Sequence, residues 1–146
     1  MLAVAPDGTS EQVMSVAQQP SGLGWMPDGS LLVVSMKDHR LLRRSAAGEV
    51  SVHADLSAYC GGHLNDMVVD SSGRAYVGEF GFDLQGFADP APGKLMRVDP
   101  EGSVEVLAAD MLFPNGSVIT PGGDTLIVGE TAGARYTRSR WPPTAR

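Results

Sequence analysis

The sequence has a single cysteine, no long apolar run and no stretch with the periodicity of a helix. With Cys60 alone, an intrachain disulfide is excluded. No apolar run approaches the ~18 residues that a membrane span needs. The first eight residues lack the basic start and apolar core of a signal peptide. The expected location is therefore cytoplasmic, unless a signal precedes Met1.

Several familiar catalytic signatures are also missing. There is no Gly-x-Ser-x-Gly elbow, no Ser/His/Asp order typical of a hydrolase triad and no phosphate-cradling glycine loop. The histidines His39, His53 and His63 lack the close pairing of a zinc site. The net charge is −6, and four of the eleven basic residues lie in residues 131–146. Such an acidic body argues against nucleic-acid binding.

What the sequence does contain is glycine and proline, 18 and 10 residues spread along the chain without a low-complexity tract. Three segments repeat one pattern, an apolar run, a polar turn and a second apolar run: GWMPDGSLLVV (24–34), MVVDSSGRAYV (67–77) and VITPGGDTLIV (118–128). This pattern predicts β-hairpins. A second series of turns lies between them, at residues 6–8, 46–48 and 100–102.

Two hairpins in each period of ~45 residues give four strands per unit, the arithmetic of a propeller blade. We therefore predict an all-β fold, a β-propeller of about three blades over residues 1–130. A β-sandwich with similarly spaced strands is the alternative. An arc of three blades leaves open sheet edges, which invite association.

Residues 131–146 differ from the rest of the sequence. They are basic, and Pro142 and Pro143 rule out a central strand there. We expect this segment to be an atypical, irregular tail. One interpretation is a basic disordered tail, and the other is a chain that has lost its proper continuation, for example through a change of reading frame.

Three motifs together resemble the gluconolactonase/regucalcin family, which also includes luciferin-regenerating enzymes. They are GGHLNDMVVDSSGRAYVG (61–78), FPNGSVITPGGDTLIV (113–128) and the turn PSGLGWMPDG (20–29). The family's corresponding patterns are (R/H)-x-N-D-x-x-x-D-x-x-G-R, P-N-G followed by a hairpin, and P-x-G-(L/I)-x-x-x-x-D-G. The resemblance covers residues 2–137.

This resemblance implies a six-bladed propeller that hydrolyses sugar lactones or related lactones with one divalent metal, most often calcium, in its channel. Asn115 matches the family's central metal ligand. Asn65, with the basic His63 two positions before it, matches the pair that faces the substrate. The implied partner is a small-molecule lactone, with no nucleic acid and no membrane.

The chain departs from the family pattern in its acidic ligands. The family's early Glu belongs to a segment upstream of Met1, and its late Asp lies well beyond residue 130. Calcium takes 6–8 oxygen ligands, so one amide from Asn115 does not hold it. The sequence therefore predicts an incomplete metal site in this chain.

Each candidate residue also has a purely structural interpretation. Asn115 precedes a glycine and suits a tight turn, and Asn65 suits an Asx turn into the following strand. His63 follows two glycines and suits a solvated loop. Glu79 and Glu130 both follow Val-Gly at the end of a predicted strand. This repeated placement indicates mainly structural residues, with the channel as the alternative destination.

Three hypotheses about function follow. The first is a lactone hydrolase of the gluconolactonase type, with its activity impaired or lost in this chain. The second is a non-catalytic propeller module that serves as a binding scaffold. The third, a variant of the first, is a homodimer in which two halves close one ring.

Overall fold

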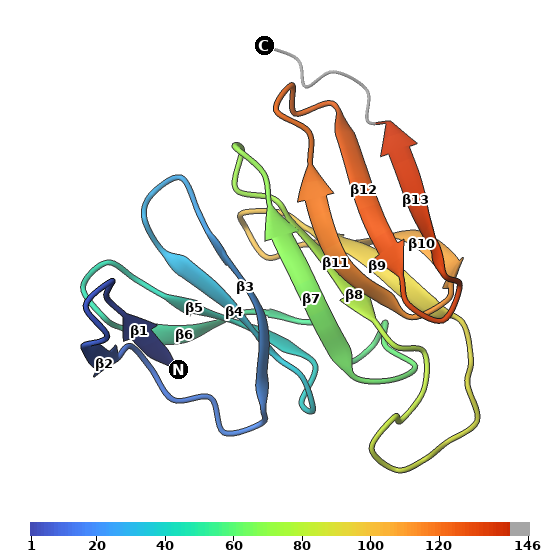
Figure 1. The fold of residues 1–146 in the computed structure, drawn as a ribbon, viewed down its shortest axis with the longest axis horizontal. Coiled ribbons are helices and arrows are strands. Elements are labelled where there is room, and N and C mark those ends of the chain that lie inside the picture. The colour runs from blue at the N-terminus through green and yellow to red at the C-terminus, as the bar shows by residue number, and fades with distance from the viewer. Residues whose placement is uncertain (141–146) are drawn as a thin grey trace.

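The computed structural model of the chain describes residues 1–140 and contains β-strands without a helix. Accordingly, no described segment is a helix that could cross a membrane. The strands form four antiparallel sheets, which follow one another along the arc of Figure 1. The strands are β1 (Leu2–Val4), β2 (Ser10–Gln12), β3 (Pro20–Trp25), β4 (Leu31–Ser35), β5 (Arg40–Arg44), β6 (Val50–Asp55), β7 (Leu64–Val69), β8 (Ala75–Glu79), β9 (Gly93–Val98), β10 (Val104–Met111), β11 (Pro114–Ile119), β12 (Thr125–Glu130) and β13 (Arg135–Arg140).

Every strand pairs only with strands next to it in the sequence. The sheets are β1–β2, β3–β4–β5–β6, β7–β8–β9–β10 and β11–β12–β13. The three predicted hairpins are therefore confirmed, and their turns contain Gly29, Gly73 and Gly123 at positive φ. Only glycine adopts this conformation without strain.

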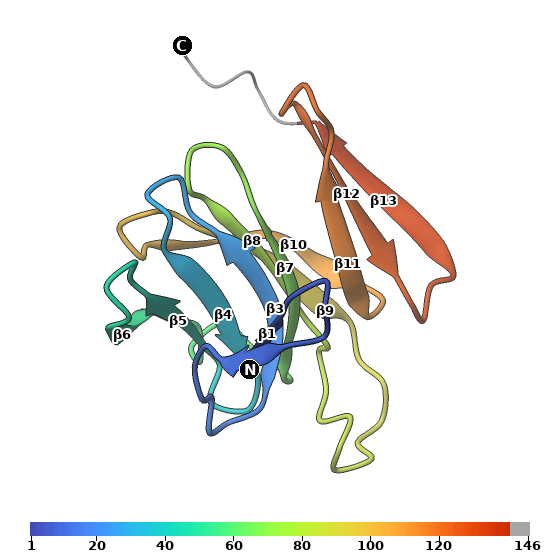
Figure 2. The same ribbon diagram turned by 60° about the vertical axis from the view of Figure 1, so that its left-hand side comes forward.

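The sheets are arranged as propeller blades. The first strands of successive sheets lie side by side, β3 against β7 and β7 against β11. They form the inner edge of the arc, and the later strands of each sheet fan outward (Figures 1 and 2). The predicted partial β-propeller is thus confirmed, and the sheets do not close into a ring among residues 1–140.

Apolar side chains fill the spaces between successive sheets. The second strand of the middle sheet shows this best, because its side chains alternate between two cores. Ala75 and Val77 belong to the core shared with the β3–β6 sheet, whereas Tyr76 belongs to the core shared with β11–β13. All five residues of β8 are buried. The middle sheet is therefore stabilised from both sides.

The inner strands approach one another very closely at Gly22. A Cβ at this position would lie 2.5 Å from the backbone nitrogen of Met67 on β7. No side chain, not even a methyl group, fits between β3 and β7 here. The glycine of the Pro-x-Gly-Leu turn therefore sets how tightly the first two complete blades pack.

The structure corrects the expectation for the beginning of the tail. Residues 135–140 form β13, which pairs with β12 along its whole length. The irregular segment predicted over 131–146 therefore does not begin at residue 131. Six residue pairs hold this strand on β12, and the guanidinium of Arg135 adds an ion pair with the buried carboxylate of Glu130. Pro142 and Pro143 lie outside the described residues.

The close approach at Gly22 leads to a stability prediction. Changing Gly22 to Ala is expected to lower the free energy of unfolding by about 1–3 kcal/mol, because the methyl group must push two backbones apart. Urea denaturation followed by circular dichroism measures this change. Gly122→Ala is the matched control, since its nearest neighbour would be 3.5 Å away, an ordinary contact. If the two variants are equally stable, the tight packing of β3 on β7 is contradicted.

Candidate active site

The strand pairing places one residue of each inner strand at an equivalent position. Leu64 pairs with Glu79 in the middle sheet, just as Pro114 pairs with Glu130 in the next. The residues that follow are Asn65 and Asn115, so the two asparagines start neighbouring strands at the same end of the arc. In β3 the corresponding residue is Ser21. All three precede a shift in strand register, a bulge that re-aims side chains.

Asn65 joins two inner strands. Its side chain is buried, and its Nδ2 donates a hydrogen bond of 3.0 Å to the carbonyl oxygen of Pro114 on β11. Among residues 1–140, its Oδ1 accepts no hydrogen bond. This asparagine therefore fixes the spacing of β7 and β11, and its carbonyl oxygen remains for another partner.

Asn115 is more accessible than Asn65. Its Nδ2 lies 3.3 Å from the hydroxyl oxygen of Thr131, in the turn between β12 and β13. It lines a shallow cavity of about 340 Å³ together with Thr131, Arg135 and Tyr136. An exposed amide oxygen beside such a cavity is chemically suited to ligate a cation.

His63 lies in the loop just before β7. Its side chain is 16% exposed, and its Nδ1 lies 3.8 Å from the Oδ1 of Asp83. This distance is too long for a hydrogen bond. The His39 ring is 6.2 Å away between centroids. The buried Nδ1 of His63 and Nε2 of His39 have no hydrogen-bond partner within the described residues.

A long connection between β8 and β9 hangs from this end of the arc, in yellow-green at the foot of Figure 1. It carries Asp83 to His63 and reaches back to the first complete blade. There Gln85 donates a hydrogen bond of 2.8 Å from its Nε2 to the Oε1 of Gln19. Phe87 at its tip is 95% exposed. The connection thus borders the candidate site on one side.

Glu79 and Glu130 are both buried and both have structural tasks. The Oε2 of Glu79 accepts hydrogen bonds from the backbone N–H groups of Gly62 and Gly81, at 2.9 and 2.8 Å. The Oε2 of Glu130 accepts one from Leu112, at 2.7 Å. Each carboxylate therefore ties the loop before an inner strand to the end of the second strand. The structural interpretation agrees with these contacts.

Glu130 is the more strongly stabilised as an anion. Arg135 donates to both of its oxygens, at 2.8 and 2.9 Å, and the hydroxyl of Thr137 donates to Oε1. These donors lower the pKa of the carboxyl group to about 2, against the opposing effect of burial. Glu130 is therefore charged at neutral pH, and its oxygens are occupied by the protein itself.

The described residues do not form a calcium site by themselves. Within residues 1–140, no group of three or more His, Cys, Asp or Glu side chains is placed to hold a metal. The carboxylate of Glu130, which lines the same cavity as Asn115, is already bound by Arg135. Asn115 contributes one neutral oxygen, and calcium takes 6–8.

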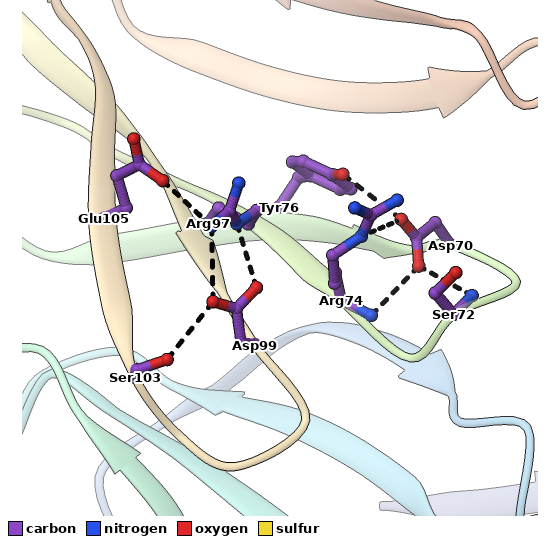
Figure 3. A network of polar contacts seen from close by, with 8 residues as sticks. All are labelled: Asp70, Ser72, Arg74, Tyr76, Arg97, Asp99, Ser103 and Glu105. Atoms are coloured by element: carbon purple, nitrogen blue, oxygen red, sulfur yellow. Dashed lines mark hydrogen bonds and ion pairs between the residues drawn. The ribbon is translucent and has the colours of Figure 1, made fainter. Parts of the chain in front are cut away.

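Two other groups are unsuited to chemistry. Burial raises the pKa of the Cys60 thiol to about 12, so it is not a nucleophile at neutral pH. Asp70 and Arg74 are joined by an ion pair of 2.7 Å at the far end of β7, in a polar network with Tyr76 and Arg97 (Figure 3). The carboxylate of Asp70 also caps the turn at Ser72 and Arg74. This network holds a hairpin together at the end opposite the candidate site.

Comparison with known proteins decides the family. The model of the SMP-30/gluconolactonase/LRE-like region matches residues 1–142. The chain belongs to this family. The resemblance seen in the sequence motifs is therefore confirmed. A comparison with curated protein sequences gives no match.

Solved structures of family members have the same fold. An X-ray structure of a gluconolactonase-like protein has a TM-score of 0.74 and 21% sequence identity, covering 99% of this chain and 52% of that one. Regucalcin from Agrobacterium tumefaciens, described as a calcium-binding protein, has a TM-score of 0.62 and 22% identity, covering 87% and 42%. The chain therefore spans about half the length of the structures it matches.

The fold is shared more widely than the family's activity. Virginiamycin B lyase from Staphylococcus aureus has a TM-score of 0.63 at 11% identity, covering 98% of this chain and 49% of that one. At such low identity the likeness shows the fold alone. The activity has to be argued from the residues at the site.

Two residues at the site were not predicted from the sequence. Asp83 lies in a Gly/Pro-rich insertion, and nothing in its local sequence connects it to His63. Ser21 stands where the other two inner strands have asparagine. Aligning the three hairpins by their strand pairing would have found Ser21, because Pro20, Leu64 and Pro114 start equivalent strands.

The Glu130 contacts predict a pH dependence. The folded-state pKa of this carboxyl lies below its unfolded value, so its stabilising contribution is present above pH ~4.5 and is lost as the pH falls towards ~2. Glu130→Gln should lower the free energy of unfolding at pH 7 by roughly 2 kcal/mol. This value allows for the solvent that screens the ion pair at the exposed Arg135.

Urea denaturation between pH 7 and pH 2 measures this prediction. The variant should show a shallower loss of stability in acid than the unmodified chain. Glu105→Gln is the control, because Glu105 pairs with Arg97 while 56% exposed, and an exposed pair contributes little. Equal acid profiles for the unmodified chain and Glu130→Gln would overturn the assignment.

Proposed function

We propose that the chain contributes the substrate side of a metal-dependent site for the hydrolysis of sugar lactones or related lactones. The observation that supports this proposal best is the placement of Asn65 and Asn115 at the same position of neighbouring inner strands. His63 lies in the loop just before Asn65. Family membership supports the same chemistry.

His63 and Asn65 are proposed to bind the lactone. A sugar lactone presents several hydroxyl groups and a ring ester, so it is recognised by side chains that both donate and accept hydrogen bonds. The free Oδ1 of Asn65 accepts from a hydroxyl, and the part of the His63 ring that remains exposed offers a second contact. Asp83, beside His63, adds an acceptor on the same side.

Asn115 is proposed as a metal ligand, with calcium as the most suitable ion. A neutral amide oxygen ligates a hard cation without reducing its charge. The remaining ligands are not among residues 1–140, so the 146-residue chain alone should not catalyse lactone opening. The alternative function is a non-catalytic binding scaffold. It is worth testing because the same fold occurs in proteins with other activities, so the fold alone does not imply lactone hydrolysis.

Ligand binding distinguishes these two functions. We expect the 146-residue chain to bind a six-membered sugar lactam, a stable analogue of the lactone, with a dissociation constant near the millimolar range. His63→Gln should weaken binding at least about fivefold, because a buried hydrogen-bond partner is lost. Saturation-transfer NMR measures both values.

His53→Gln is the matched control, since His53 lies on β6 in the outer part of another sheet. Its substitution should leave lactam binding unchanged. Calorimetry with calcium alone should show no binding at about 5 mM, because one amide oxygen is not a calcium site. Absence of lactam binding at about 10 mM, or equal weakening by both histidine variants, would favour the scaffold.

A further inference from the structure

The two ends of the arc expose sheet faces that are buried in its middle. The leading face belongs to the β3–β6 sheet and is formed by Leu23, Trp25, Leu31 and Val33. The trailing face belongs to β11–β13 and is formed by Val118, Ile127 and Tyr136. The two sheets that carry these faces lie at opposite ends of the arc (Figure 2).

The trailing face repeats a face that is buried elsewhere in the same chain. By strand pairing, its three residues correspond to Val68, Tyr76 and Leu95 of the middle sheet. Those three pack in the core against β11–β13, where Tyr76 is 2% and Leu95 3% exposed. Tyr136, in contrast, is 83% exposed and Val118 58%. The trailing face is thus a packing surface without its neighbour.

The leading face is covered only in part. Leu31 and Val33 are buried under residues around the β1–β2 hairpin, of which Met14 is the most buried. On the inner strand, Leu23 remains 50% and Trp25 62% exposed. Their counterparts Met67 and Val69 on β7 pack in the core between the two complete blades.

A groove follows this uncovered strand. Its volume is about 400 Å³, and its lining includes Leu2, Leu23 and Trp25, with Glu11 on β2. On the trailing face, Arg138 and Arg140 are exposed on β13, on the same side as Tyr136. The trailing face therefore carries two exposed cations, whereas the groove is lined by one acid, Glu11, and one base, Arg44.

We propose that a second copy of this chain covers both faces, with the trailing face of each copy packed on the leading face of the other. This contact reproduces the one that already joins the middle sheet to β11–β13. In this contact, β11–β13 of the other copy cover the part of the leading face that the β1–β2 hairpin leaves exposed. The proposal is independent of lactone hydrolysis.

The arc closes at two copies. It covers 52% of a gluconolactonase-like propeller chain with a TM-score of 0.74, so each copy accounts for about half of such a structure. Two identical head-to-tail contacts related by a two-fold axis then leave no open face.

Light scattering on the purified 146-residue chain measures its oligomeric state. We expect a mass twice the 15.3 kDa of the chain at micromolar concentration. Leu23→Glu and Val118→Glu should each weaken the dimer at least about tenfold, because a charge is buried in an apolar contact. Val106→Glu, on the outer strand of the middle sheet, is the matched control and should leave the dimer intact.

Mixing the two interface variants distinguishes head-to-tail from face-to-face pairing. In a mixed dimer, both damaged faces meet in one contact and the other contact is intact, so the mixture should dimerise better than either variant alone. Circular dichroism should show that all variants are folded. A monomer at about 100 µM, open polymers, or no recovery on mixing would each overturn the proposal.

Discussion

Apolar packing between the faces of successive sheets is the interaction on which this structure depends. An isolated antiparallel sheet of three or four short strands buries little surface, so each sheet here depends on packing against its neighbours. The middle sheet has a neighbour on both faces, and its second strand is wholly buried. The last sheet, β11–β13, has one neighbour, and Ile127 and Gly129 of its second strand remain partly exposed. The sheets at the ends of the arc therefore gain less from packing than the middle sheet does.

The same packing determines where chemistry can occur. Because the inner strands lie side by side, equivalent residues at their starts gather at one end of the arc. Asn65 and Asn115 lie there at equivalent positions of neighbouring strands, and the buried carboxylates of Glu79 and Glu130 hold the preceding loops in place. The position of the candidate site therefore follows from the repetition of the sheets.

Hairpins, sheet order and family could be predicted from the sequence because they depend on local turn chemistry and short motifs. Gly29, Gly73 and Gly123 mark turns that only the neighbouring residues determine. The strand at residues 135–140 could not be predicted, since its polar sequence has no apolar alternation and the strand is held by its pairing with β12. The approach of Asp83 to His63 likewise depends on how a long connection folds back.

Amide hydrogen exchange as a function of protein concentration tests most directly the claim that each sheet needs a neighbour on both sides. The account predicts that β8 is strongly protected at all concentrations. It also predicts that protection of β3 and β12 rises as the chain is concentrated and its open faces become covered. Protection of β12 equal to that of β8 in dilute solution, with no change on concentration, would contradict it.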